Sequence, residues 1–130
     1  MSAAADGDIM DRKAHAVEFL RLLRTGDRDG ASRLVAPGAR HHNAYFAAGM
    51  PTLIDAAVEA SRTAPDRASE VKLVIAEGDH VMVHSHVWHQ VGHPGVSVVH
   101  IFRFEGDRIA ELWDVGQPVP ADSPNADGMF

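Results

Sequence analysis

A chain of 130 residues, 45% of them hydrophobic and 23% charged, has the size and composition of one globular domain with a buried core. Its net charge of -6, without a cluster of Lys and Arg, argues against nucleic acid or a membrane surface as a partner. The lack of cysteine excludes disulfides and thiolate metal sites, and because no segment resembles a signal peptide or a membrane span, we expect a cytoplasmic location. The unusual feature is the nine histidines, five of which lie in 80–93.

The first half of the chain is expected to form three helices. Residues 1–7 are small or acidic, and we expect them to be disordered. Apolar residues then recur at helical spacing, Asp27 can cap a second helix, and Pro51 suits the first turn of a third, where its missing N–H needs no partner. Residues 40–45 read as a short extended segment. The predicted helices cover roughly 9–24, 27–35 and 49–64.

The second half of the chain has the pattern of an antiparallel meander. Gly92-His93-Pro94-Gly95 is a turn-forming tetrad between two strand-like runs and predicts a hairpin. The sequence therefore predicts an α+β fold in a single domain, 1–130, with three helices before roughly four strands and a tail at 117–130. The expected strands cover roughly 71–76, 80–91, 96–104 and 109–115.

Alternation along the run 80–91 separates two faces of the predicted hairpin. Valines at odd positions alternate with histidines and Trp88 at even positions, and alternate residues of a strand point to opposite faces of the sheet. The valine face is too apolar to be left in water, so we expect a homodimer that pairs through the sheet. The expected members of this face are Val81, Val83, Val87, Val99 and Ile101.

Four stretches of the chain have counterparts in a known family. They are His41-His42-Asn43, Val83-His84-Ser85, the run IFRFEGDRIAELWDV at 101–115, and the ending Gly128-Met129-Phe130. They resemble the SnoaL-like branch of the nuclear-transport-factor-2-like superfamily, which is named for a polyketide cyclase. The resemblance covers nearly the whole chain from Ile9 and implies a cone-shaped fold, in which three N-terminal helices pack on a curved antiparallel sheet and enclose a pocket. This fold hosts cyclases, isomerases, hydrolases, dehydratases and pure binders, so the resemblance does not decide the reaction.

Two positions depart from the family pattern. The pocket aspartate, which serves as acid or base in SnoaL-like cyclases, falls at His100, and the histidine before the Trp-Asp pair falls at Leu112. A histidine also transfers protons, and its reference pKa of about 6.5 suits neutral pH better than the value of about 3.9 for an aspartate. The resemblance therefore implies that His100 replaces the aspartate in the pocket.

The face on which the other histidines lie depends on the register of the hairpin. A five-residue loop sets His86 opposite His100 and His84 opposite Phe102, whereas a four-residue loop puts His84 and His86 on the far face. The family word around His84 favours the first register, which we adopt.

The register of the last hairpin decides which neighbour shares the face of His100. If Glu105 pairs with Arg108 across a two-residue turn, His100 lies opposite Trp113. On a regular strand Asp114 then points to the other face, and it reaches the pocket only if a bulge intervenes.

These placements define a candidate site for proton transfer. His100 is expected to act as base or acid, with His42 or Asn43 as donor to a developing enolate oxygen and His84 as a further catalytic residue. We therefore favour a cofactor-free enzyme that cyclises or isomerises a small apolar carbonyl compound by acid/base catalysis. The residues expected to hold the substrate are Asn43, Tyr45, Phe46, His86, Trp88, Phe102, Trp113 and Asp114.

Two other functions stay open. A non-catalytic protein can bind a small apolar molecule in the same pocket. Alternatively, His42, His84 and His100 can hold a metal ion in a hydrolase or isomerase, because neutral imidazole is a common metal ligand. The sequence contains no compact metal-binding motif, so we expect no metal and no organic cofactor.

Overall fold

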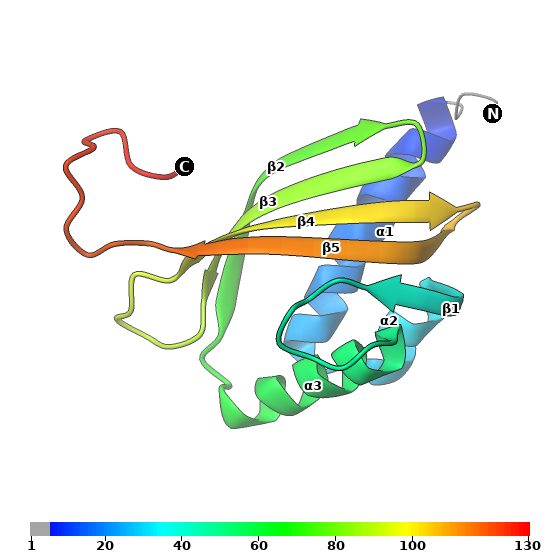
Figure 1. Cartoon of the computed structure of the whole chain (residues 1–130), viewed down its shortest axis with the longest axis horizontal. Coiled ribbons are helices and arrows are strands. Elements are labelled where there is room, and N and C mark those ends of the chain that lie inside the picture. The colour runs from blue at the N-terminus through cyan, green and yellow to red at the C-terminus, as the bar shows by residue number, and fades with distance from the viewer. Residues whose placement is uncertain (1–5) are drawn as a thin grey trace.

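The computed structural model describes residues 6–130 of the chain. Within them, three helices and five strands build the expected α+β fold, with β1 between α2 and α3 (Figure 1). The first helix begins at Asp6, so residues 6 and 7 are helical rather than disordered, and residues 1–5 lie outside the described part. The elements are α1 (Asp6–Thr25), α2 (Arg28–Arg33), β1 (Val35–His41), α3 (Met50–Thr63), β2 (Ala68–Glu77), β3 (His80–Trp88), β4 (Val96–Glu105) and β5 (Arg108–Pro118).

Local sequence explains where two of the helices begin. The Asp27 side chain caps α2, because it accepts a hydrogen bond from the backbone N–H of Gly30 at 2.8 Å. Pro51 lies in the first turn of α3, where it removes no helical hydrogen bond. Both starts confirm the prediction. Within residues 6–130 no helix combines the length and the apolar character that crossing a membrane requires.

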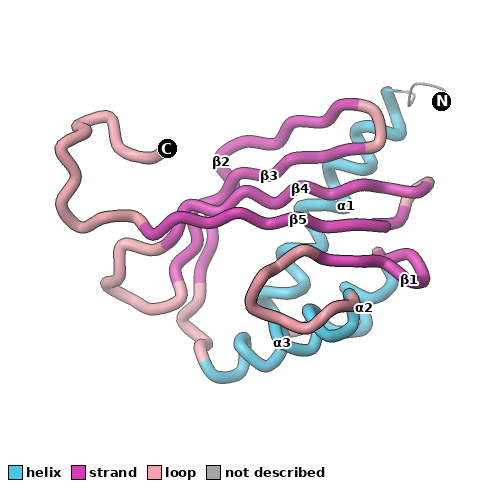
Figure 2. Tube along the Cα trace, viewed as in Figure 1, coloured by secondary structure: helices cyan, strands magenta, loops and turns pink. Residues whose placement is uncertain are grey.

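The strands form one curved sheet in the order β1-β5-β4-β3-β2 (Figure 2). β1 pairs with β5 in parallel, and the other neighbours are antiparallel. The helices pack on one face of the sheet, which we call the inner face, and the opposite face is the outer face (Figure 1). The described chain has one strand more than expected, because β1 pairs along Val35–His41 where only an extended segment at 40–45 was predicted.

The hairpin of β3 and β4 has a different register from the one adopted from the sequence. The connection at 89–95 is longer than five residues, so His86 lies opposite Ser97 and His84 lies opposite Val99. This pairing differs from the adopted one by three residues, and an odd shift exchanges the two faces of a strand, so both histidines belong to the outer face. The predicted pairing of His86 with His100 is therefore wrong.

The same register corrects the predicted dimer face. Val81 and Val83 are 1% and 0% exposed in the core, and Val87 lines a cavity on the inner face. Of the expected apolar set, Val99 and Ile101 lie on the outer face, since they alternate with the inward residues of β4.

A bulge changes the pairing of β4 with β5. Glu105 lies opposite Arg108, as predicted, but the register then shifts by one residue. Beyond the shift, His100 lies opposite Asp114 rather than Trp113. Asp114 therefore shares the inner face with His100, and Trp113 points to the outer face.

The core fills only one half of the inner face. Phe19 of α1 and Phe102 of β4 are fully buried and meet edge to face, with ring centroids 5.9 Å apart and ring planes at 83°. Burying an apolar side chain of this size contributes about 1.5–3 kcal/mol. The buried side chains around them include Leu22, Met50, Leu53, Ile54, Val58, Val81, Val83, Phe104, Ile109 and Leu112.

Candidate functional site

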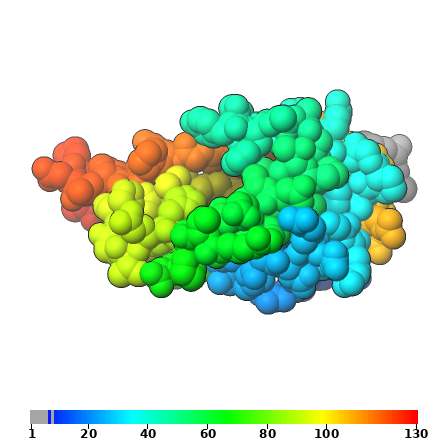
Figure 3. Space-filling view, turned by 90° about the horizontal axis from the view of Figure 1, so that it is seen from below, coloured from blue at the N-terminus to red at the C-terminus, as the bar shows by residue number. Residues whose placement is uncertain are grey.

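A cavity of about 740 Å³ lies between the other half of the inner face and helices α1 and α3. Its opening is visible as a recess between the connection at 89–95, in yellow-green, and α3 (Figure 3). The volume falls within the range of about 300–1,000 Å³ that is usual for small-molecule sites. Most of the lining is aliphatic and includes Val17, Leu20, Leu23, Leu53, Ala57, Val71, Val87, Val96, Val98 and Leu112.

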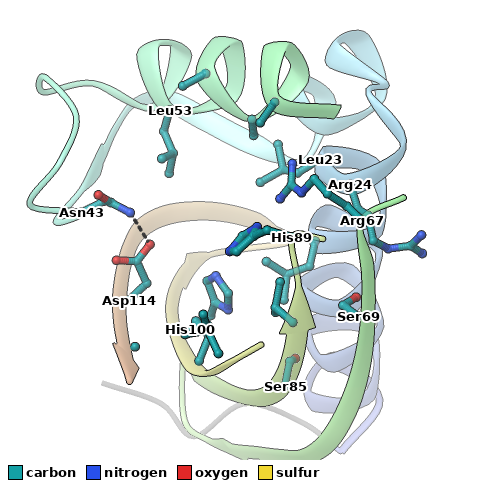
Figure 4. A pocket seen from close by; sticks show the side chains of 18 of the residues that line it. Leu23, Arg24, Asn43, Leu53, Arg67, Ser69, Ser85, His89, His100 and Asp114 are labelled. Atoms are coloured by element: carbon teal, nitrogen blue, oxygen red, sulfur yellow. Dashed lines mark hydrogen bonds between the residues drawn. The ribbon is translucent and has the colours of Figure 1, made fainter. Parts of the chain in front are cut away.

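The polar side chains of the cavity lie in separate places. Asn43 and Asp114 are on one side, and Arg24 and Arg67 are on the opposite side (Figure 4). His100 lies between the two groups (Figure 4). Apolar walls strengthen the electrostatic effect of each of these groups, because the local dielectric constant is low.

His100 has an unused hydrogen-bonding group inside the cavity. Its ring is half-buried and lines the cavity, and Nδ1 is buried without a hydrogen-bond partner among the described residues. Burial lowers the pKa of His100 to about 4, and the nearby Asp114 carboxylate opposes this shift. The imidazole is therefore neutral at pH 7.

Asn43 positions the carboxylate of Asp114. The Nδ2 atom of Asn43 donates to Oδ2 of Asp114 at 2.9 Å, and Oδ1 of Asn43 accepts from the backbone N–H of Tyr45 at 2.9 Å. The amide is thus held at both ends. An amide nitrogen carries two hydrogens, so Asn43 has a second N–H besides the one bonded to Asp114.

The loop that carries Asn43 is held by His41, a buried residue that the sequence analysis passed over. Nε2 of His41 donates to the carbonyl oxygen of Ala47 at 2.8 Å, and Nδ1 accepts from the backbone N–H of Asn43 at 3.1 Å. One tautomer satisfies both bonds. Tyr45 and Phe46 follow in the loop and line the mouth of the cavity, where they are 91% and 44% exposed.

His42 and Trp113, both expected in the pocket, lie on the outer face instead. Their rings stack with centroids 5.1 Å apart. Nε2 of His42 meets Oε2 of Glu111 at 2.5 Å, and Arg103 and Arg40 contact the same carboxylate. The hydrogen bond from His42, with those from the arginines, lowers the pKa of Glu111. His42 points outward because it follows the buried His41, which points inward. The bulge between β4 and β5 turns Trp113 outward.

His84, His86 and Trp88 also lie on the outer face, so the expectation that they line the pocket is wrong. His86 donates through Nε2 to the carbonyl oxygen of Pro94 at 2.7 Å and stacks on Trp88 with centroids 3.7 Å apart. Phe130, at the end of the chain, stacks on His84 and His86 with centroid distances of 5.4 and 4.3 Å. The register of β3 is the cause, because it turns every even residue of the strand outward.

Two further expectations fail for positional reasons. Phe102 fills the core beside Phe19 and does not line the cavity. His42 and His84 lie on the outer face while His100 lies on the inner face, so these three side chains cannot hold one metal ion together. Within residues 6–130 no group of three or more His, Asp or Glu side chains has the arrangement of a metal site.

The cavity also contains polar residues that the sequence analysis missed. Arg24 continues the apolar stripe of Val17 and Leu20 along α1, so an arginine at a core-facing helical position was the available signal. Ser85 and His89 are odd residues of the 80–91 run, whose odd face was assigned to the outside. Arg67 precedes β2 in a turn without a recognisable pattern. The missed polar residues are Arg21, Arg24, Thr63, Arg67, Ser69, Ser85 and His89.

Comparison with known proteins agrees with this architecture. The SnoaL-like domain family matches residues 16–112. The chain belongs to the SnoaL-like family. In this SnoaL-like domain, His100 stands on the inner face in the cavity, and Asp114 lies opposite it. A search of the curated proteins finds no match.

Solved structures share the fold of this SnoaL-like domain. A proposed ketosteroid isomerase from Kribbella flavida is 14% identical, with a TM-score of 0.72 over 91% of this chain and 86% of that one. AclR, a proposed hydroxylase from Streptomyces galilaeus, is 23% identical, with a TM-score of 0.68 over 84% and 90%. A proposed SnoaL-like polyketide cyclase from Jannaschia sp. is 20% identical, with a TM-score of 0.65 over 89% and 92%. These likenesses confirm the predicted cone-shaped fold.

Proposed function

We propose that this SnoaL-like domain is an enzyme that moves a proton at the carbon next to a carbonyl group, leading to cyclisation or isomerisation of a small apolar compound. His100 is the proton-transferring group. The observation that carries the proposal is the buried, unpartnered Nδ1 of His100 in an apolar cavity beside Asp114. A buried polar atom without a partner costs about 1–3 kcal/mol, and a site that binds substrate can offset that cost.

The charge state of His100 supports a role as base. Burial keeps the imidazole in the neutral form that can accept a proton at pH 7, although the pKa of about 4 makes it a weaker base than a free histidine. When it takes a proton from the substrate it becomes a cation, and the negative charge of Asp114 favours that cation. The electrons of the broken C–H bond pass to the carbonyl oxygen and form an enolate. Return of the proton to another carbon isomerises the compound. Alternatively, the enolate carbon attacks a second carbonyl and closes a ring, and His100 then gives its proton to the alkoxide that forms.

The enolate oxygen needs a hydrogen-bond donor. His42 was one expected donor, but it lies on the outer face. Asn43 remains, because its second amide N–H is available after the bond to Asp114. In this proposal Asn43 therefore serves both to orient Asp114 and to stabilise the enolate.

Hydrogen–deuterium exchange tests the proposal without knowledge of the natural substrate. We would incubate 2-tetralone, an apolar bicyclic ketone with acidic C–H bonds, with the protein in D2O and follow exchange by NMR. The protein is expected to accelerate exchange, and His100→Gln is expected to lower that acceleration by about 10²–10⁴-fold, the usual contribution of a general base.

A matched control comes from the outer face. His84→Gln makes the same replacement on the neighbouring strand but away from the cavity, and it is expected to leave exchange unchanged. Equal exchange by the protein and His100→Gln would contradict a catalytic role. Binding of 2-tetralone without accelerated exchange would instead favour the alternative of a non-catalytic small-molecule binding protein.

We also propose that two copies pair through the outer face of the sheet. The support is apolar exposure there: Leu73 and Ile75 of β2 and Val115 of β5 are 48%, 50% and 66% exposed. Sedimentation velocity is expected to give a dimer at micromolar concentration, and Ile75→Lys is expected to give a monomer. A monomeric parent protein would refute this pairing. A cytoplasmic location also remains a prediction, which cell fractionation would test.

A further inference from the structure

Two arginines face the cavity from elements that are far apart in the sequence. Arg24 lies in the last turn of α1, and Arg67 lies just before β2. Both side chains are on the side of the cavity opposite Asn43 and Asp114 (Figure 4). This end of the cavity is therefore positively charged, while most of the remaining lining is aliphatic.

The buried guanidinium nitrogens of both arginines lack a hydrogen-bond partner within residues 6–130, and Arg67 has more of them than Arg24. Nε of Arg24 and both Nε and Nη1 of Arg67 are buried without a hydrogen-bond partner among the described residues. The ion pairs formed by the described side chains also include neither arginine. Buried charges in proteins are otherwise paired and hydrogen-bonded, so this arrangement lacks an anion.

Neighbouring positive charges add to the repulsion around these two arginines. Burial and the positive charge of Arg24 together lower the pKa of Arg67. His89, which lines the same cavity, has a pKa lowered by burial and then by the charges of Arg67 and His93. The C-terminal end of α1 attracts a cation and accounts for an arginine at position 24, but it does not satisfy Nε. The protein thus holds two like charges together where a bound anion would stabilise both.

We propose that Arg24 and Arg67 bind the carboxylate of a ligand whose apolar body occupies the rest of the cavity. A guanidinium is planar and donates two parallel hydrogen bonds, which match the two oxygens of a carboxylate. The aliphatic lining accepts an apolar body. Arg21 of α1 also lines the cavity, but its guanidinium is already paired with Glu18 at 2.5 Å. The ligand is therefore an amphipathic carboxylic acid.

This inference rests on the proposed function for its account of the substrate. His100 lies between the arginine pair and the Asn43–Asp114 pair (Figure 4). A ligand anchored by its carboxylate at the arginines would extend its body across His100. The substrate class is then an apolar keto acid, with the reacting carbonyl between the anchored carboxylate and Asn43.

Isothermal titration calorimetry with two probes of equal shape tests the carboxylate site. The probes are 2-naphthoate and 2-naphthamide, which share an apolar body and differ in charge at neutral pH. The acid is expected to bind at least about tenfold more tightly than the amide. Arg24→Gln and Arg67→Gln are each expected to weaken binding of the acid by about tenfold and to leave the amide unchanged.

Arg62→Gln is the matched control, because Arg62 is an exposed arginine of α3 paired with Glu59 and does not line the cavity. It is expected to bind both probes like the parent protein. Circular dichroism and urea unfolding establish that each variant is folded. Where one single variant is unfolded, the other carries the test.

Three results would overturn the proposal. They are absent binding of 2-naphthoate at millimolar concentration, equal affinity for acid and amide, and a preference for the acid that survives both arginine substitutions. Tighter binding of 2-naphthyl phosphate than of 2-naphthoate, by tenfold or more, would overturn the assignment to a carboxylate. His100→Gln is expected to keep the preference for the acid. If the parent protein does not accelerate exchange but prefers the acid, the proposed function fails and the carboxylate site stands.

Discussion

The two halves of the sheet's inner face differ in packing, because side chains fill the space below the helices in one half and line a cavity in the other. In the packed half, Phe102 and Phe104 of β4 reach the helices and are 0% and 2% exposed. In the hollow half, the same strand carries Val96, Val98 and His100 toward a cavity. Large aromatic side chains at one end of β4 and smaller side chains at the other thus divide one continuous face into a core and a pocket.

The polar groups follow the same division. His100 and Asp114 lie in the hollow half, where each meets cavity rather than close-packed carbon. The packed half stabilises the fold through burial, whereas the hollow half contains buried polar atoms without a hydrogen-bond partner among the described residues, among them Nδ1 of His100. Stability and function are therefore separated along one strand, and substitutions in the two halves should behave differently.

The largest expected effect is the difference in unfolding free energy between Phe102→Ala and Val98→Ala. Phe102 is enclosed by other side chains, so its truncation leaves a void and is expected to cost about 3–5 kcal/mol of unfolding free energy. Val98 already borders the cavity, so its truncation is expected to cost only about 1 kcal/mol. Urea unfolding measures both values. Similar costs for the two variants would show that the halves are not packed differently.

The second prediction concerns the pH dependence of stability in the hollow half. The pKa of His100 is about 4 in the folded protein, below the reference value of about 6.5 for an unfolded chain. The unfolded chain therefore binds more protons between these values, and the stability contributed by neutral His100 is lost as pH falls through this window. From pH 7 to pH 5 the loss is expected to be roughly 2 kcal/mol.

His100→Gln isolates this contribution, because the other titrating groups are common to both proteins. Urea unfolding at pH 7 and pH 5 should give a smaller difference in the variant than in the parent. Glu111 contributes in a separate, more acidic range, since its lowered pKa lies below the ordinary value of 4.5. An equal loss of stability in parent and variant would mean that His100 is not buried in its neutral form.

The fold could be predicted from the sequence because its signals are local. Asp27 and Pro51 mark helix starts through their own hydrogen-bonding chemistry, and the pair Glu105–Arg108 was placed correctly across its turn. Each of these features depends on a few consecutive residues. The same holds for the family words, each of which is a run of consecutive residues, such as 101–115 across the turn between β4 and β5.

The site could be predicted only in part, because it depends on register between strands. His100, Asn43 and Asp114 are in the cavity, but Asp114 arrives there through a bulge that alternation alone does not indicate. His84 was assigned to the wrong face because the observed pairing differs from the predicted one by three residues, an odd number, in a hairpin with a long connection. Arg67 comes from a turn, where no periodicity shows which way a side chain points.

The smallest expected effect concerns the stability cost of the arginine pair in the hollow half. Arg67→Met removes a positive charge beside Arg24 and two buried nitrogen atoms, Nε and Nη1, that have no partner among the described residues, and it keeps an unbranched apolar side chain. Without ligand, the variant is expected to be more stable by about 1 kcal/mol, which corresponds to a rise in Tm of about 4 °C. Differential scanning calorimetry measures this shift, and Arg62→Met, at an exposed position, serves as the control. A lower Tm for Arg67→Met than for the control would mean that Arg67 is retained for packing. A higher Tm would mean that the protein keeps this charge at the expense of its own stability, as a binding residue does.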